Sequence, residues 1–574
     1  MDFFRKGIKQ EQIALLIIML INLKAMFLYS DMVLDFQSDI TSILPIVLKA
    51  PIYYFSVLIV PMSIITLLGL LQNKYLRGIL VGVVLGFYLI IFVVDAFLWQ
   101  NFGGVLDQNK LEILLTTDTK TTIEFLSLYV GYKGLIILSL IAAASYILIK
   151  KLKTKLEKIK WLIRVEGGVL AISLVVGSIF WGSIILGDVP ITSNFRLFRI
   201  YNSTSIFRLY QEFTAACKSL GNEQMIMPLL DERKNMEDVS VSDDTPYVIF
   251  ILGESTDRNK MSAYGYKNDT TPLLNKRIES GETVLFTDTI ACANSTRTAM
   301  SRIFSFVDKT TQSPWYENGC MIDIFNKAGF YTSYLSNQSP SDRYGNMDGV
   351  LAKRSAEFAF TSSEGSGIGI WARPYDSELL PLLDNSLAKN TNAKSFYTIH
   401  LTGTHESFKM RFPKEFAHFT ADEENAPEEK WREMQADYDN AVLYNDYIVD
   451  EIIKRFTDKN AVLIYISDHG SDVYNDNIEG FIGHSSEDKR SPHMIEIPML
   501  VWGSNSFWSS HSELKQELIA AKDRPYSTEN VIHFIFDLAG IKTSSYDSQK
   551  SILNPDNIYQ HQPRMYGGVP YHKE

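Results

Sequence analysis

The sequence predicts a membrane protein with two parts: an N-terminal α-helical transmembrane bundle of about five helices and a C-terminal α/β domain. Two observations support this fold class. Residues 1–190 are dominated by long apolar runs, whereas residues 230–574 have the composition of a soluble, acidic protein. From Thr245 onward, apolar runs typical of buried strands alternate with helical patterns. We therefore expect a transmembrane domain over residues 1–190, a linker over residues 191–244 and a soluble domain over residues 245–574.

Five apolar segments have about the length that a membrane span requires, which is roughly 20 residues for a bilayer core of about 30 Å. The segments are residues 13–29, 46–71, 79–99, 125–149 and 167–186. Buried core helices of a soluble protein are the alternative. Runs such as residues 79–94, ILVGVVLGFYLIIFVV, argue against it because they have no polar face.

Basic residues are unevenly distributed between these segments. They cluster before the first, between the second and third, and between the fourth and fifth, where residues 150–164 carry six lysines and one arginine. Basic loops stay on the cytoplasmic side of a membrane. With an odd number of spans, the C-terminal domain is then expected on the outer side.

The linker combines two patterns. Residues 194–220 interleave aromatic and aliphatic side chains with arginines, which suits a helix lying in the membrane interface. A helix packed on the soluble domain is the alternative. The polar residues 231–244 that follow are interpreted as a flexible tether.

Charge and cysteine content exclude two classes of protein. The net charge of −11 argues against a nucleic-acid partner, because binding phosphates needs clustered lysine and arginine. The three cysteines, Cys217, Cys292 and Cys320, are too few for a disulfide scaffold or a cysteine-built zinc site.

Potential metal ligands follow three predicted strands of the soluble domain. Residues 247–253 run into Glu254, residues 395–401 precede His405, and residues 461–467 run into Asp468 and His469. Sites in open α/β sheets lie at the carboxyl ends of strands, so these side chains are expected to meet in one cleft. Carboxylates with imidazoles suit Zn²⁺, with Mn²⁺ as the alternative. A single Asp-His pair is more often a hydrogen-bonded turn, but three such strand ends together favour a site.

Four sequence blocks stand out in the soluble half: residues 253–266, GESTDRNKMSAYGY; residues 292–302, CANSTRTAMSR; residues 403–405, GTH; and residues 467–470, SDHG, with His484 downstream. In order and spacing these blocks resemble those of the phosphoethanolamine transferases, which are membrane-anchored members of the alkaline phosphatase/sulfatase superfamily. The resemblance covers nearly the whole chain and implies a sulfatase-like fold for residues 245–574.

The resemblance also implies a role for individual residues, with Thr296 as the catalytic nucleophile. The implied zinc ligands are Glu254, Thr296, Asp468 and His469. The residues implied at the substrate phosphate are His405 and His484, which could instead bind a second metal, and Asn337 in the block YLSNQ. A threonine hydroxyl is a poor nucleophile at neutral pH, and coordination to Zn²⁺ makes its alkoxide accessible.

The activity implied is transfer of phosphoethanolamine from phosphatidylethanolamine to an envelope glycan, such as a lipopolysaccharide core sugar or lipid A. Thr296 would attack the donor phosphorus, diacylglycerol would leave, and the acceptor would resolve a covalent phospho-threonine intermediate. The expected partners are the lipid donor, a glycolipid acceptor and membrane lipids. The expected location is the bacterial inner membrane, with a multi-pass anchor and a periplasmic catalytic domain.

Three other functions remain open. A phosphoglycerol transferase, or another phosphodiester or sulfate ester hydrolase of the superfamily, would use the same ligands. Sulfatases proper are disfavoured because the residues after Thr296 lack the proline of their nucleophile motif. A membrane sensor that keeps the fold without turnover is disfavoured because all the ligands are present, and a transporter because the spans show no repeats.

The chain departs from many of these relatives around the nucleophile. Arg302 stands where they have the second of two cysteines that bracket the nucleophile loop, so Cys292 lacks that partner. A bridge between Cys292 and Cys320 is the pairing left open. Ser471 replaces a glutamate that commonly follows the Asp-His-Gly motif. These differences bear on the acceptor rather than on the type of reaction.

Overall fold

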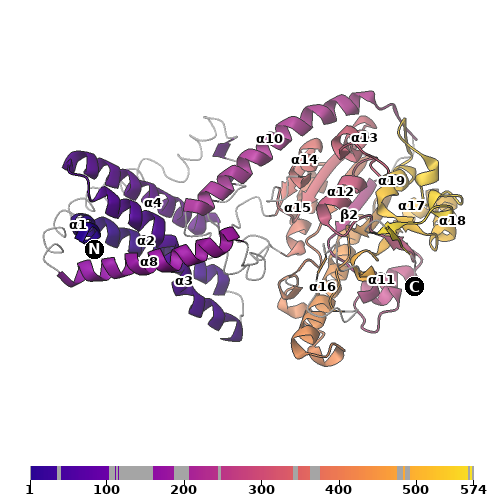
Figure 1. The fold of residues 1–574 in the computed structure, drawn as a ribbon. Coiled ribbons are helices and arrows are strands. Elements are labelled where there is room, and N and C mark those ends of the chain that lie inside the picture. Colours follow the sequence, from indigo (N-terminus) through magenta and orange to yellow (C-terminus); the bar gives the residue numbers. More distant parts are fainter. Residues whose placement is uncertain are drawn as a thin grey trace. The chain divides into compact units, whose positions relative to one another are not determined.

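The computed structural model describes residues 2–34, 40–102, 106, 110–111, 114–115, 160–186, 206–242, 247–340, 347–361, 375–392, 394–406, 408–474, 483–484, 491–566 and 569–571. The chain forms two units, Met1–Cys217 and Lys218–Glu574 (Figure 1). The expected domain limits at residues 190 and 244 stay predictions.

The described residues of the first unit are mostly helical. Its helices are α1 (Asp2–Gln10), α2 (Gln12–Leu34), α3 (Ile40–Leu68), α4 (Lys74–Phe102) and α8 (Lys160–Leu186). Four of the five expected spans therefore fall on helices. The remaining expected span, residues 125–149, lies outside the described residues.

Small residues let these helices approach closely. Gly177 of α8 lies against Ile59 of α3, where an added Cβ would be only 3.0 Å from the Ile59 Cδ1. The side chains between the helices form an apolar core that includes Leu15 and Leu58. Large apolar side chains also point outward, for example Ile90, which is 65% exposed. A helix that is apolar on both its inner and outer sides is typical of a membrane span.

Two described helical segments are long and apolar enough to cross a bilayer, Lys74–Leu98 and Trp161–Ile179. Two shorter described segments, Gln12–Leu23 and Tyr54–Leu68, are also apolar. The described residues thus support helices of membrane-spanning character, and the count of five spans stays a prediction.

Helix α10 (Ile206–Met236) corrects the expectation of a flexible tether over residues 231–244. The helix continues through Met236, and the strand β1 (Val239–Val241) then pairs antiparallel with β11 (Ile541–Thr543). The polar composition led to the wrong prediction because charged side chains of this segment form ion pairs with the soluble domain. Arg354, for example, contacts Asp231 at 2.6 Å. Ile226 and Leu230 are buried in the core of the second unit. These contacts lie beyond residues 194–220, for which both an interfacial helix and a helix packed on the soluble domain stay predictions.

The second unit is built on a seven-stranded sheet within its described residues, in the order β3-β9-β8-β2-β7-β5-β6. The strands are β2 (Tyr247–Gly253), β3 (Thr283–Phe286), β5 (Tyr331–Ser336), β6 (Glu357–Phe360), β7 (Ser395–His400), β8 (Ala461–Ser467) and β9 (Met499–Gly503). The strands β8, β2, β7, β5 and β6 run parallel, whereas β9 is antiparallel to both its neighbours. The expected α/β domain is confirmed.

Helices cover both faces of this sheet (Figure 1). Alternate residues of β2 enter two separate cores: Phe250 packs into one with α12 and α19, and Ile251 into the other with α16. The helices of this unit are α11 (Pro272–Glu279), α12 (Thr296–Ile303), α13 (Met321–Lys327), α14 (Met347–Arg354), α15 (Leu379–Lys389), α16 (Glu429–Lys454), α17 (Asn505–Ser510), α18 (Ser512–Ala521) and α19 (Val531–Ala539). The short strands outside the sheet are β4 (Thr289–Ile290), β10 (Tyr526–Ser527), β12 (Met565–Tyr566) and β13 (Val569–Pro570).

The three strands expected to carry ligands are neighbours at the centre of the sheet, in the order β7-β2-β8. Their register aligns the carboxyl ends: Leu252 is paired with His400, and Gly253 with Ser467. Residues separated by more than 200 positions therefore emerge side by side.

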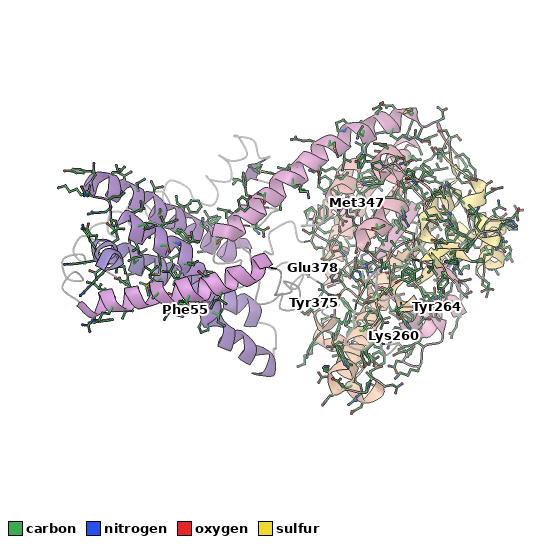
Figure 2. The ribbon with its side chains drawn as sticks, in the orientation of Figure 1. Phe55, Lys260, Tyr264, Met347, Tyr375 and Glu378 are labelled. Atoms are coloured by element: carbon green, nitrogen blue, oxygen red, sulfur yellow. The ribbon has the colours of Figure 1, made fainter. Side chains whose placement is uncertain are left out.

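One buried charged cluster of this unit is internally neutralised. Lys260, labelled in Figure 2, is 4% exposed and donates to the Tyr266 hydroxyl at 2.9 Å. Its Nζ also lies 3.9 Å from Asp439 Oδ1 and 4.0 Å from Glu424 Oε2. A lysine already occupies the place that a metal cation would take, so this cluster has a structural role.

Glu237 lies between the end of α10 and strand β1, and its hydrogen bonds predict that the stability of the folded protein depends on pH. Burial alone would raise the pKa of Glu237, but hydrogen bonds from Ser545, Thr543 and Ser544, with the charge of Arg233, hold it below its ordinary value. A depressed carboxyl pKa stabilises the fold above the ordinary value, and this contribution is lost as the pH falls through the lowered one.

We expect Glu237→Gln to lower stability at pH 7 by on the order of 1–3 kcal/mol, because a buried charged acceptor is lost. The difference from wild type should shrink as the pH falls below the ordinary pKa of glutamate. Thermal unfolding of the full-length protein in detergent across this pH range measures it. Glu232→Gln, an exposed position on the same helix, is the matched control. A pH-independent difference would contradict the assignment.

Candidate active site

Glu254 is positioned by the end of strand β2. The seven-residue strand is buried along nearly its whole length, which fixes the direction in which the chain leaves the sheet. The next residue, Ser255, has a φ of 60°, a left-handed conformation that is strained for a serine. The Ser255 hydroxyl donates to Glu254 Oε1 at 2.7 Å. The sharp turn therefore presents the Glu254 carboxylate at the top of the sheet.

Asp468 and His469 follow the neighbouring strand β8. Asp468 Oδ1 accepts hydrogen bonds from the backbone amides of Ser255 at 3.1 Å and His469 at 2.7 Å. His469 Nδ1 lies 2.8 Å from the carbonyl oxygen of Gly470, to which it donates. The tautomer that makes this bond leaves Nε2 as an acceptor directed at Glu254 and Asp468, at 3.4 and 3.2 Å.

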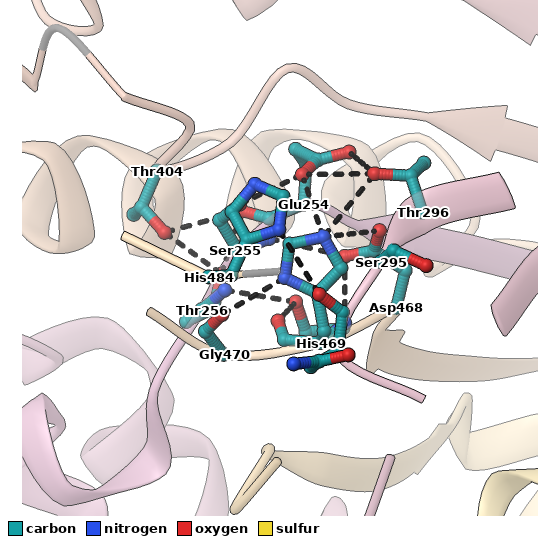
Figure 3. A network of polar contacts seen from close by, with 12 residues as sticks. Glu254, Ser255, Thr256, Ser295, Thr296, Thr404, Asp468, His469, Gly470 and His484 are labelled. Atoms are coloured by element: carbon teal, nitrogen blue, oxygen red, sulfur yellow. Dashed lines mark hydrogen bonds and ion pairs between the residues drawn. The ribbon is translucent and has the colours of Figure 1, made fainter. Parts of the chain in front are cut away.

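Thr296 is the first residue of helix α12. Its Oγ1 lies 3.2 Å from His469 Nε2, and 3.5 and 3.3 Å from the two oxygens of Glu254 (Figure 3). The structure thus brings together all four residues for which the resemblance implied zinc binding. A nucleophile at a helix N-terminus also benefits from the positive end of the helix dipole.

These residues fit a divalent cation. Candidate ligand atoms of Glu254, Asp468 and His469 all lie within 4.8 Å of one another. Asp468 Oδ2 is buried and accepts no hydrogen bond from the described residues. Two buried carboxylates, one imidazole nitrogen and one hydroxyl form a donor set that Zn²⁺ accepts readily.

The ionisation of these groups supports the same conclusion. Burial, and then the charge of Asp468, raise the pKa of Glu254 above its ordinary value. Burial raises the pKa of Asp468 to about 6. It lowers the pKa of His469 and brings that of His484 to about 4. The imidazoles are therefore neutral and able to bind a metal at physiological pH, and a cation would stabilise both carboxylates in their ionised form.

A second group of candidate metal ligands consists of Glu254, His405 and His484. The ligand atoms of these three residues also lie within 4.8 Å of one another. His484 Nδ1 lies 3.0 Å from the Asn294 carbonyl oxygen, just before the nucleophile. The His484 ring centroid is 4.0 Å from that of His469 and 6.2 Å from that of His405. Both histidines are thus beside the first group, where they could contact a phosphate or hold a second metal.

The turn that carries His405 is tied to Glu254. Asp376 accepts from the amides of Thr402 at 2.8 Å and Gly403 at 2.9 Å. Gly403 has a φ of +50°, and an added Cβ would lie 2.8 Å from the Glu254 carbonyl oxygen, so only glycine fits. The Thr404 hydroxyl donates to that same carbonyl at 3.1 Å.

Asn337 lies deeper than the other candidates. It is fully buried, and its amide nitrogen donates to Asp376 Oδ1 at 2.7 Å while its oxygen accepts from the Thr361 hydroxyl. The neighbouring Gln338 instead reaches Glu254, with Nε2 at 3.5 Å from Oε2. The Gln338 Nε2 also donates to the Leu401 carbonyl oxygen at 2.9 Å, and a contact from Asn337 to phosphate stays a prediction.

The nucleophile loop is braced by Arg302 in place of a disulfide. The Arg302 Nη1 donates to the carbonyl oxygen of Cys292 at 2.7 Å, which joins the two ends of residues 292–302. Cys292 and Cys320 are both buried free thiols. The bridge between them that the sequence left open is therefore not formed in the structure.

Sequence reasoning missed the residues that support the ligands. Tyr438, in the middle of α16, donates its hydroxyl to the Ser255 carbonyl oxygen at 2.8 Å and accepts from the Asp257 amide at 2.8 Å. No motif marks Tyr438 or Asp376, because their role depends on where distant backbone groups arrive. Gln338 could have been found, because it follows a fourth parallel strand, β5, of the same sheet.

Comparison with known proteins agrees with this architecture. The sulfatase family model matches residues 246–541, just over half of the chain. The chain therefore belongs to the sulfatase family.

Within that family the chain is similar to phosphoethanolamine transferases, which confirms the resemblance found in the sequence blocks. Phosphoethanolamine transferase EptC of Escherichia coli O18:K1:H7 (strain RS218 / NMEC) is 29% identical over 377 residues, covering 64% of this chain and 62% of the relative. Phosphoethanolamine transferase CptA of Salmonella typhimurium (strain LT2) is 30% identical over 372 residues, covering 63% and 62%. The match spans less than two thirds of these relatives' own length.

The solved C-terminal periplasmic domain of EcEptC from Escherichia coli superimposes with a TM-score of 0.52 at 28% identity, covering 59% of this chain and 93% of that domain. The same values hold for the structure of that domain in complex with Zn. The sulfatase-like fold of the second unit is thereby confirmed.

The first group of ligands predicts one tight zinc site that depends on the charge of Asp468. Asp468→Asn keeps the Oδ1 acceptor for the amides of Ser255 and His469 but removes a negative charge from the metal-facing oxygen. We expect elemental analysis of the purified protein to show zinc in wild type and its loss in this variant.

Metal-free Asp468→Asn should be at least as thermally stable as metal-free wild type, because the repulsion with Glu254 is relieved. Asp422→Asn, at an exposed position, should retain zinc. Equal zinc in all three proteins would overturn the assignment of the site.

Proposed function

We propose that this chain is a zinc-dependent phosphoethanolamine transferase of the bacterial envelope. It takes phosphoethanolamine from phosphatidylethanolamine and places it on an envelope glycan, either a lipopolysaccharide core sugar or lipid A. The observation that carries the proposal is the position of Thr296 Oγ1, 3.2 Å from His469 Nε2 and 3.3 Å from Glu254 Oε2, within a buried set of metal-binding groups. The similarity to phosphoethanolamine transferases supports the choice of transferred group.

The residues that would hold zinc are Glu254, Thr296, Asp468 and His469, with Mn²⁺ as the alternative metal. Bound there, the cation would lower the pKa of the Thr296 hydroxyl and offset negative charge on the phosphoryl group. The complex of the Escherichia coli relative's domain with Zn supports the choice of metal.

Transfer proceeds in two half-reactions. In the first, Thr296 loses its hydroxyl proton, its oxygen bonds to the donor phosphorus, and the bond from phosphorus to the diacylglycerol oxygen breaks. The leaving oxygen takes up a proton and diacylglycerol departs. In the second, a hydroxyl or phosphate oxygen of the acceptor bonds to phosphorus and the Thr296–phosphorus bond breaks, which returns the threonine hydroxyl.

The histidines beside the nucleophile are suited to the proton movements. Burial, and the neighbouring His469, bring the pKa of His484 to about 4, so its imidazole is neutral at physiological pH. A neutral imidazole can accept the proton that an acceptor hydroxyl loses in the second half-reaction. His484 and His405 have ring nitrogens close to Glu254, so they are the groups assigned to this role.

The remaining parts of the proposal concern the membrane. We propose a bundle of five spans over residues 1–190, a linker with an interfacial helix over residues 191–244, and a periplasmic catalytic domain over residues 245–574. The basic loops support this orientation. Phosphatidylethanolamine and glycolipids would then reach the site from the outer leaflet.

The covalent route predicts that Thr296 becomes modified by the donor. Intact-protein mass spectrometry of wild type incubated with phosphatidylethanolamine should show one phosphoethanolamine adduct, located on Thr296 by fragmentation. Thr296→Ala should show no adduct and lose transfer by on the order of a thousandfold or more. Thr298→Ala, at an exposed position two residues further along α12, is the control. An adduct on another residue would refute the assignment.

The orientation of the chain predicts the behaviour of reporter fusions. Alkaline phosphatase fused after Glu574 should be active, because it folds only outside the cytoplasm, whereas a fluorescent protein at the same position should stay dark. Fusions after Gln72, in the basic loop between the second and third spans, should give the opposite pair of signals. The reverse pattern at Glu574 would exclude a periplasmic catalytic domain.

A further inference from the structure

Glu406 directly follows His405 and is held in a fixed backbone position beside the active site. Arg411, itself only 4% exposed, donates through Nη2 to the Glu406 carbonyl oxygen at 3.0 Å and through Nε to the His405 carbonyl oxygen at 3.2 Å. The guanidinium of Arg411 is thus committed to backbone oxygens of this turn. The side chain of Glu406 is left to extend toward the site.

The Glu406 carboxylate packs on the backbone of Gly483. Gly483 has a φ of +112°, a conformation that favours glycine, and its lack of a Cβ leaves the place that Glu406 Oε1 occupies. Gly483 is anchored by paired hydrogen bonds with Asp472, at 3.0 and 2.8 Å, and the next residue is His484. The carboxylate therefore lies beside His484 and within the electrostatic influence of Glu254.

Among the described residues, no lysine or arginine forms a salt bridge with this carboxylate. It is half-buried, and burial and the like charge of Glu254 raise its pKa, which the nearby charge of Arg411 offsets only in part. Neither group of candidate metal ligands includes Glu406. Glu406 therefore lies next to the residues that would bind metal and phosphate without being one of them. We expect a substituent of the bound phosphate to lie at this position.

We propose that Glu406 selects the donor lipid by receiving the ammonium group of the ethanolamine headgroup. This inference rests on the proposed function and adds the residue that distinguishes its substrate. The ammonium of phosphoethanolamine is two carbons from the phosphate oxygen, so it remains close to a phosphate held at Thr296. A glycerol headgroup carries no charge to neutralise Glu406, and binding it would leave the carboxylate buried and unpaired.

The test uses full-length protein in detergent micelles with two lipids of identical acyl chains, phosphatidylethanolamine and phosphatidylglycerol. Release of diacylglycerol gives kcat/KM for each. We expect wild type to prefer phosphatidylethanolamine, and Glu406→Gln to reduce the ratio of the two constants by at least about tenfold, mainly through KM. Glu406→Asp should retain part of the preference. Glu415→Gln, an exposed glutamate of the same connection, should leave the ratio unchanged.

Two further measurements separate the alternatives. Elemental analysis of Glu406→Gln should show wild-type zinc, and a loss of zinc would assign Glu406 to metal binding and overturn the proposal. Calorimetric titration with O-phosphoethanolamine and with glycerol 3-phosphate should show a preference for the amine in wild type that is lost in Glu406→Gln. An unchanged ratio of lipid constants in Glu406→Gln would refute the role of Glu406 while the transferase function stands. Amine-selective binding without any transfer to a glycolipid would instead refute the proposed function alone.

Discussion

Two like-charged carboxylates, Glu254 and Asp468, are held fully buried at the ends of neighbouring strands, and much of the second unit serves to keep them there. Water cannot stabilise them, and their mutual repulsion raises the pKa of Glu254 further. Such a pair persists only if the surrounding fold is rigid and a cation can complete the site. The strain of Ser255, the amides aimed at Asp468 and the orientation of His469 are all consequences of this constraint.

The position of Thr296, the proposed nucleophile, depends on the same constraint through a different element. Thr296 comes from α12, which is not sequential with either ligand strand, so its loop must be fixed independently. Arg302 does this with a hydrogen bond to Cys292, in a position where many relatives use a disulfide. A hydrogen bond to a charged donor contributes on the order of 1.5–3 kcal/mol and, unlike a disulfide, needs no oxidising environment. The loop can therefore be ordered with both nearby thiols free.

The site combines groups with different tasks. Asp376 binds backbone amides and holds the turn of Thr402 and Gly403. Glu254, Asp468 and His469 are suited to metal, and His405 and His484 lie beside them. Glu406 lies against Gly483, next to His484, and we propose that its charge bears on which headgroup is accepted. Reaction type and headgroup preference would then belong to different residues of one site.

The soluble fold was largely predictable because buried parallel strands have a plain signature. The runs at residues 247–253, 395–401 and 461–467 predicted the three central strands, and the rule that strand ends converge placed Glu254 and Asp468 together. The tether over residues 231–244 was predicted wrongly. Its polar side chains suggested a solvated linker, but partners such as Arg354 and residues 543–545, far away in the chain, make them part of a helix and strand.

The amino-acid pattern by itself determined the class of each half, the strands that carry ligands and the types of ligand, because these depend on local hydrophobic periodicity and on the residues at strand ends. Tertiary structure alone decided which side chains make the contacts in and around the site: Gln338 rather than Asn337 at Glu254, Arg302 at Cys292 and Glu406 at Gly483. Those contacts join segments whose separation in sequence carries no periodic signal. Only the sheet register and the packing of loops above it bring the atoms within a few ångströms.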